Sequence, residues 1–181
     1  MSAAEEFSEK ENARGKNRVK SRKMSWMAMF IALSAVGASI KIPAVIGSVA
    51  LDSFPALLAA GLLGGPAGAA AGGLGHLLSA IIGGMPLGPL HLLVAGEMAL
   101  LAYLFALLYK NGKRWSAGVL FIMGNSFAAP LPFIFLMGKS FYLAIVPSLF
   151  AGSLLNTLLA LIVLPRIVKL LEHSLPLSRE T

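Results

Sequence analysis

Long apolar runs, separated by short breaks of polar residues, glycine and proline, fill the chain from Met24 onward. The longer runs approach the roughly 20 consecutive apolar residues that a helix needs to cross a bilayer. They predict six helical spans, at residues 24–40, 54–63, 67–82, 90–109, 115–137 and 141–168. The pattern is therefore that of an all-α membrane protein, a six-span helical bundle.

The second predicted span is short, and residues 54–63 alone do not cross a bilayer of ordinary thickness. They can pair with the preceding loop as a half-buried element, because broken backbone is tolerated at membrane depth where protein or a cavity surrounds it. That loop, residues 41–53, contains Pro43 and Gly47 and is too interrupted to form a helix. Glycine and proline also crowd residues 83–89, which form a second loop.

Basic residues are distributed unevenly along the chain. Seven of the fifteen Lys and Arg residues lie in the first 23 positions. With six spans, the two tails and the turn at 110–114 share one side of the membrane and hold thirteen bases, whereas Lys41 and Lys139 are the two bases of the other side. Because basic loops stay in the cytoplasm, the pattern predicts a multi-pass protein of the cell membrane with both termini cytoplasmic.

These features divide the chain into three parts. Residues 1–23 form a basic cytoplasmic tail, solvated and poorly ordered at its start, residues 24–170 form the six-helix membrane domain, and residues 171–181 form a polar cytoplasmic C-terminal tail. The first apolar run resembles a secretion signal, but its basic segment is long, carries four Glu residues and is followed by further spans. We therefore interpret this run as a retained helix.

Composition excludes several classes of protein. The chain is 57% hydrophobic and 13% charged, which excludes a disordered chain and an ordinary soluble domain. The net charge of +7 comes from bases at span ends rather than from a basic patch with aromatic residues, so nucleic acid is not an expected partner. The acidic headgroups of the lipid bilayer suit the basic tail better. The chain has no cysteine, which excludes disulfides and thiolate metal sites.

A few polar residues lie within the spans or at their ends, where such groups are costly and mark functional candidates: His76, Ser79, His91, Glu97, Asn125 and Asn156. Glu97 stands roughly 12 Å along the fourth span from its outer end, at the rise of a helix. Its carboxylate there needs a partner, a proton or a wet cavity. His76 and Ser79 share a face of the third span, whereas a spacing of six residues puts His91 and Glu97 on different faces.

Plainer interpretations of the same residues remain open. A hydrogen-bond network between helices, for example from Glu97 to His76, satisfies these groups without a ligand, and Asn125 and Asn156 suit helix packing. The sequence does not show the geometry that a metal site needs. Gly138-Lys-Ser ends like a phosphate loop, but Phe133 stands where its first glycine belongs and no strand precedes it. A transporter of this sequence would therefore draw its energy from a partner or an ion gradient.

Small residues repeat at helical spacing in two places. Ala28 and Ala32, with Ala35 nearby, give the first span a small face that suits packing inside the protein or docking of another protein. Glycines at four-residue spacing predict a close approach of helix backbones around the second and third spans: Gly64, Gly68 and Gly72.

Several segments together form a familiar pattern over residues 24–168: Ile42-Pro43, Gly47–Asp52, Leu63–Ala69, Gly72–Ser79 and Gly83–Pro86. The pattern resembles the substrate-binding S components of energy-coupling factor (ECF) vitamin transporters. The resemblance implies a small membrane protein without a cofactor that captures a vitamin or vitamin precursor from outside. It also implies a partner, the ECF module, which consists of a transmembrane scaffold and two ATPases.

The resemblance also implies where the functional residues lie. Ala28 and Ala32, extended by Ala35, match the docking motif on the first helix of the family. The substrate site lies near the outer face, capped by the extracellular loops at 41–53 and 83–89. The candidate substrate-binding residues are the polar groups in and below these loops: Glu97, His91, His76, Ser79, Asp52 and Asn125.

Within the family, the His-Leu-Leu-Ser segment and the Pro-Leu-Gly-Pro-Leu-His segment with Glu97 resemble the α-ribazole and pantothenate members. A neutral nucleoside such as α-ribazole suits Glu97, His and Asn as hydrogen-bond partners, with Phe127, Phe133 and Phe135 as flat neighbours. The expected function is therefore capture of α-ribazole, with pantothenate or another vitamin as the alternative. A stand-alone gradient-driven carrier or an intramembrane enzyme is the further alternative.

Overall fold

The computed structural model describes residues 3–43 and 48–171. The long helices are α1 (Ala3–Ser39), α3 (Gly65–Ile82), α4 (His91–Lys110) and α7 (Lys139–Leu171), and the shorter ones are α2 (Ser53–Leu63), α5 (Arg114–Met123) and α6 (Pro132–Met137). Two single turns complete the helical part, the 3-10 turn η1 (Gly88–Leu90) and the π turn η2 (Gly124–Ala128). The strands β1 (Lys41–Pro43) and β2 (Ser48–Ala50) pair antiparallel.

The helical class and most of the breaks predicted from the sequence are confirmed. Four segments are long and apolar enough to cross a membrane, residues 65–82, 88–110, 114–137 and 139–170, and α2 is a shorter apolar helix. In the loop expected at 41–53, β1 and β2 form an antiparallel β hairpin that the sequence did not reveal, and Ser53 already begins α2. Gly138, with φ of 90°, ends α6 and lets α7 begin at once at Lys139.

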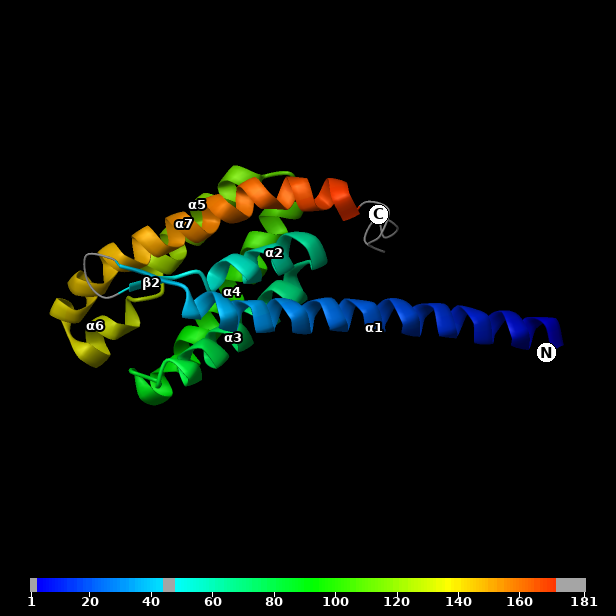
Figure 1. Ribbon diagram of the computed structural model, residues 1–181, viewed down its shortest axis with the longest axis horizontal. Coiled ribbons are helices and arrows are strands. Elements are labelled where there is room, and N and C mark those ends of the chain that lie inside the picture. The colour runs from blue at the N-terminus through cyan, green and yellow to red at the C-terminus, as the bar shows by residue number, and fades with distance from the viewer. Residues whose placement is uncertain (1–2, 44–47, 172–181) are drawn as a thin grey trace.

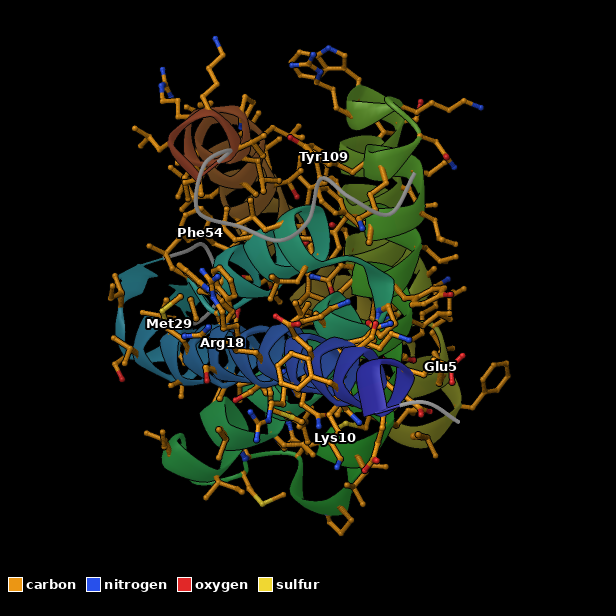
Figure 2. All side chains as sticks on the ribbon, turned by 90° about the vertical axis from the view of Figure 1, so that its right-hand side faces the viewer. Glu5, Lys10, Arg18, Met29, Phe54 and Tyr109 are labelled. Carbon is orange, nitrogen blue, oxygen red and sulfur yellow. The ribbon has the colours of Figure 1, made fainter. Side chains whose placement is uncertain are left out.

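The basic tail differs from expectation, because α1 begins at Ala3 and continues without a break into the first apolar run. The prediction of a poorly ordered start is therefore wrong from Ala3 onward. Glu5 and Glu6 in the first turn suit the positive end of the helix dipole, and Lys10 pairs with Glu6 one turn away. The N-terminal part of α1 extends beyond the other helices (Figure 1), and Glu5, Lys10 and Arg18 mark it in the end-on view of Figure 2.

The short helix α2 lies at the centre of the protein. Nine of its eleven residues are buried, and it packs against α1, α3, α4 and α7. Leu57, Ala59 and Ala60 have no exposed surface. A helix that is too short to cross a bilayer on its own is thus enclosed by neighbouring helices, which is the setting in which interrupted backbone is tolerated at membrane depth.

Glycines allow this close enclosure. A Cβ built on Gly68 would lie 2.6 Å from Ala60 Cβ, and one on Gly72 would lie 2.8 Å from the carbonyl oxygen of Met98. The prediction of close backbone packing from the glycine repeat is confirmed at these two positions. Gly64 has a different role from Gly68 and Gly72. Its φ of 97°, which glycine adopts readily, makes the sharp break between α2 and α3.

The fifth predicted span, residues 115–137, is divided in the structure. Helix α5 passes into the π turn η2, in which Ala129 N–H donates to the carbonyl of Gly124, and α6 begins only at Pro132. Pro130 and Pro132 have no N–H to continue a regular ladder, so the chain turns here. The turn brings α6 beside the start of α7, at the end of the molecule opposite the start of α1 (Figure 1).

We expect Gly72→Ala to lower stability, because the added methyl meets the Met98 carbonyl, which is backbone and cannot move aside. The expected loss is about 1–3 kcal/mol, the usual cost of overpacking. Thermal unfolding of the purified protein in detergent measures the effect as a lower midpoint. Gly96→Ala is the control, since a Cβ on that helical glycine has nothing within 4 Å. Equal midpoints for the two variants would contradict the packing described here.

Candidate functional site

A cavity of about 210 Å³ lies among α3, α4, η2, α6 and the start of α7, beneath the loop that joins α3 to α4. Its described lining is mostly apolar, and its polar side chains are four: His76, His91, Glu97 and Asn125. All four are candidates from the sequence, on three separate elements. An apolar cavity with a few convergent polar groups is the usual form of a small-molecule site.

Glu97 brings an unpaired carboxylate oxygen to this cavity. Its Oε2 is buried, and no hydrogen-bond partner for it exists among residues 3–43 and 48–171. The suggested pairing of Glu97 with His76 is therefore not found there. A buried carboxylate oxygen without a donor is costly, and a donor brought by a bound molecule would relieve that cost. His91 and Glu97, expected on different faces of the helix, both line the cavity with Val94 between them, because the cavity follows a wide arc of α4.

The two histidines form a directed pair. His91, which is buried, accepts a hydrogen bond at Nε2 from the backbone N–H of Leu87 at 3.3 Å, so its proton lies on Nδ1. His91 Nδ1 is 3.1 Å from His76 Nε2 and therefore donates to it. His76 in turn carries its proton on Nδ1, and both rings are neutral in this arrangement. The backbone of the α3–α4 loop thus sets the tautomers of both histidines.

Asn125 lies in the π turn η2, whose wider turn places its side chain at the cavity. Its Nδ2 donates to Ser153 Oγ at 2.8 Å, and Ser153 Oγ donates to the carbonyl of Leu149 at 2.6 Å. The described residues offer no partner to the Asn125 amide oxygen, which leaves an acceptor for a ligand. Sequence reasoning missed Ser153, because a serine inside an apolar run has no distinguishing pattern.

Aromatic rings form one wall of the cavity. Phe133 and Phe141 line it with ring centroids 5.9 Å apart. Phe127 and Phe135, expected as further flat neighbours, do not line it, and Phe135 is 90% exposed on the outside of α6. Phe141 was not foreseen, because only the turn at 129–131 brings the start of α7 back against α6.

Two candidate residues do not reach the cavity. Ser79 is half-buried on α3 and does not line it. Asp52 precedes α2, where its carboxylate accepts a hydrogen bond from Ser53 Oγ at 3.2 Å. Burial raises the pKa of the Asp52 carboxyl, and the bond from Ser53 opposes that rise. These two residues are therefore not among the described residues that line this cavity.

The described lining of the cavity contains no Lys or Arg, and the described part of the chain has no cluster of three or more His, Cys, Asp or Glu residues able to hold a metal ion. Glu97 is therefore the one acidic side chain of the described lining, and no Lys or Arg there balances it. Elsewhere, Ala28 and Ala32 lie exposed on the outer face of α1, while Phe30 and Ser34 are buried on its inner face. Ala35 is half-buried between the two faces.

A family model described as the ECF transporter, substrate-specific component, matches residues 22–176 of the chain. Comparison with curated proteins and with solved structures finds no match. The family model covers most of the chain, and the chain therefore belongs to this family. It is the substrate-binding S component of an ECF importer, a multi-pass membrane protein and not an enzyme, and its partners are a substrate and the ECF module.

Proposed function

We propose that this S component captures a neutral, ring-containing vitamin precursor that carries hydroxyl donors, with α-ribazole as the substrate. The observation that carries the proposal is the buried, unpaired Oε2 of Glu97 in an apolar cavity. A hydroxyl of the ligand would supply the missing donor, and hydrogen bonds to a charged group are among the stronger ones. Phe133 and Phe141 would lie against a flat ring.

Pantothenate is the alternative, and the cavity suits it less well. Its carboxylate requires a cation or several donors, but no Lys or Arg is among the described lining residues. Each of the two neutral histidines uses one ring nitrogen in the hydrogen bond between them, and Glu97 already brings one acidic group to the cavity. A second acid in this cavity would lack compensation, whereas the hydroxyls of a nucleoside match the acceptors of Glu97 and Asn125.

Calorimetric titration of the purified protein with α-ribazole and with pantothenate tests the substrate. Heat with α-ribazole and none with pantothenate is the expected result. The reverse result would identify pantothenate as the substrate, and the assignment of the chain to its family would still hold. Mass spectrometry of any molecule released from the purified protein by denaturation provides an independent identification.

We expect Glu97→Gln to weaken α-ribazole binding by about tenfold to a hundredfold, the cost of roughly 1.5–3 kcal/mol for a hydrogen bond to a charged group. His91→Ala acts in the same direction, because it removes the partner that orients His76. Ser79→Ala, outside the cavity, is the control and leaves the affinity unchanged. Titration of the folded variants measures all three, and an unchanged affinity in Glu97→Gln would return that residue to a structural role.

The exposed small face of α1 supports a second part of the proposal, in which Ala28, Ala32 and Ala35 dock on the ECF scaffold. We expect Ala32→Trp to block assembly with the ECF module while the affinity for substrate stays within about twofold, because Ala32 points away from the core. Leu100→Trp, at an exposed position of α4, is the control. Co-purification with the module measures assembly. Assembly at the parental level together with lost binding would mean that the face packs inside the protein.

We propose six membrane passes, with the tail, the α4–α5 turn and the C-terminal end in the cytoplasm and the cavity near the outer face. The chain has no cysteine, so single cysteines report their own positions. We expect Pro86→Cys, in the exposed α3–α4 loop, to react with an impermeant thiol reagent in intact cells, and Asn111→Cys, in the exposed α4–α5 turn, to resist it. The opposite labelling would invert the orientation.

A further inference from the structure

The hydrogen bond between the two cavity histidines leaves one of their four ring nitrogens unused. His91 uses both of its nitrogens within the protein, because Nε2 accepts from the Leu87 N–H at 3.3 Å and Nδ1 donates to His76 at 3.1 Å. His76 uses only Nε2, the acceptor of that second bond. Its Nδ1 carries the proton of the neutral ring, and no acceptor for this N–H is found among residues 3–43 and 48–171.

The position of this proton is fixed by the protein backbone. A backbone N–H is always a donor, so Leu87 bonds only to an unprotonated Nε2 of His91. The His91 proton is then confined to Nδ1, which in turn keeps Nε2 of His76 unprotonated. The α3–α4 loop, α4 and α3 thus contribute one residue each to a chain of bonds with a single direction, and the chain ends in an N–H on a residue that lines the cavity.

The unused polar atoms of the described lining form a pattern of donors and acceptors. Glu97 Oε2 and the amide oxygen of Asn125 are acceptors without a donor in the described structure. The unused side-chain donors are the Nδ1–H of His76 and the second amide hydrogen of Asn125, because the first is bonded to Ser153. A bound molecule therefore meets acceptors on α4 and η2 and a ring donor on α3.

This pattern places a demand on the flat part of a ligand. Hydroxyl groups of the ligand satisfy the two acceptors, and the aromatic wall of Phe133 and Phe141 suits a flat ring. A ring nitrogen or carbonyl enclosed by this apolar lining is costly unless a donor faces it. The N–H of His76 has the same need for an acceptor once a ligand excludes water. The two needs are met by one hydrogen bond.

We propose that His76 is a specificity-determining residue whose Nδ1–H donates to an acceptor atom on the ring of the substrate, with Leu87 and His91 as positioning residues that hold the proton on that nitrogen. The substrate class is then a hydroxylated molecule whose ring carries an unprotonated nitrogen or a carbonyl, and a ring of carbon atoms alone is bound weakly. The inference rests on the proposed function for the identity of the ligand. The position of the proton is a property of the empty protein.

Nitrogen-15 NMR of the empty protein provides the first test. The chain has three histidines, so labelling of histidine alone gives a simple spectrum, and the variant His76→Gln identifies the His76 signals. Protonated and unprotonated ring nitrogens have well-separated shifts, and correlations to the ring hydrogens distinguish Nδ1 from Nε2. We expect the His76 proton on Nδ1 at about pH 8, where imidazole is neutral. A proton on Nε2 of His76 would overturn the proposal.

The positioning role is tested by His91→Phe. This substitution keeps a ring beside His76, where the two ring centroids are 5.3 Å apart, but removes both nitrogens. We expect the His76 proton to distribute over both of its ring nitrogens, because nothing then holds it on Nδ1. If the proton stays on Nδ1 alone in the folded variant, Leu87 and His91 do not position it, and that part of the proposal is wrong.

A pair of ligands tests the specificity. α-Ribazole has a ring nitrogen that is free to accept, whereas the corresponding ribosyl-dimethylindole has a C–H group at that position and keeps the hydroxyls. We expect the parental protein to bind α-ribazole about tenfold more tightly or better, because the indole leaves the His76 N–H without an acceptor. Calorimetric titration measures both affinities, and equal values would overturn the proposal.

Two variants of His76 separate contact with the ligand from a structural role. His76→Asn keeps an amide N–H near the position of Nδ1 but is too short to bond to His91, whereas His76→Gln keeps an acceptor for His91 but has no donor at the position of Nδ1. We expect His76→Asn to retain most of the preference for α-ribazole over the indole and His76→Gln to lose it. The opposite order in folded proteins would mean that His76 acts only through its bond with His91.

Failure of the proposed substrate is distinguishable from failure of this inference. Absence of α-ribazole binding in the parental protein would count against the substrate. The nitrogen shifts of the empty protein would then decide the inference, since a proton on Nδ1 of His76 supports it and a proton on Nε2 overturns it.

Discussion

Polar groups taken into an apolar interior need partners, and this constraint accounts for the arrangement of the whole protein. Asn156 meets it fully, with three hydrogen bonds to α2, the hairpin and its own helix. Asn125 meets it in part, through Ser153. Glu97 does not meet it, because one carboxylate oxygen is buried without a donor in the described structure. Ser34, Ser126 and Thr157 also bury a hydroxyl without a partner in the described structure, but Glu97 is the one of these residues that lines the cavity, and the proposed function places the ligand there for that reason.

Close helix packing makes this arrangement possible. Gly68 and Gly72 let α3 approach α2 and α4 so closely that a methyl group has no room. Helix α2 is enclosed as a result, and the residues around it form a continuous core that includes Leu57, Phe105 and Phe121. The cavity lies outside this core, where the interrupted fifth segment turns away from α4. Close helix packing on one side and the turn at 129–131 on the other bound the cavity.

Much of the fold followed from the sequence, since apolar runs and glycine or proline breaks depend on local composition. The helices of the first four predicted spans and of the sixth, the breaks at Gly64 and at residues 83–89, and the short second helix were predicted in this way, whereas the division of the fifth span into α5, η2 and α6 was not. The pairing of β1 with β2 was not predicted either, because it depends on contacts of β2 with α1 and α7 that no local pattern encodes. The helical tail was missed for another reason: its charges suit a helix as well as a solvated coil, and only their order along the helix favours the former.

The polar lining of the cavity was predicted in part, because costly polar residues in apolar runs are visible in a sequence whereas their meeting point is not. His76, His91, Glu97 and Asn125 meet in one cavity, but Asp52 and Ser79 do not join them. The role of the Leu87 backbone amide, which orients both histidines, could not be predicted, because every residue except proline has such a group. The role of Phe141 could not be predicted either, because one phenylalanine among many is not distinctive.

The π turn at Gly124–Ala128 has a geometric consequence. A π turn contains one residue more than an α turn, and each residue of a helix advances the direction of its side chain by about 100°. The segment after η2 is therefore out of phase with α5. This shift acts on the end of α5 alone, because the chain leaves the helix after η2 and turns at residues 129–131 before α6 begins at Pro132. Asn125 reaches the cavity from inside the π turn, and Phe133 reaches it from the helix that follows the turn.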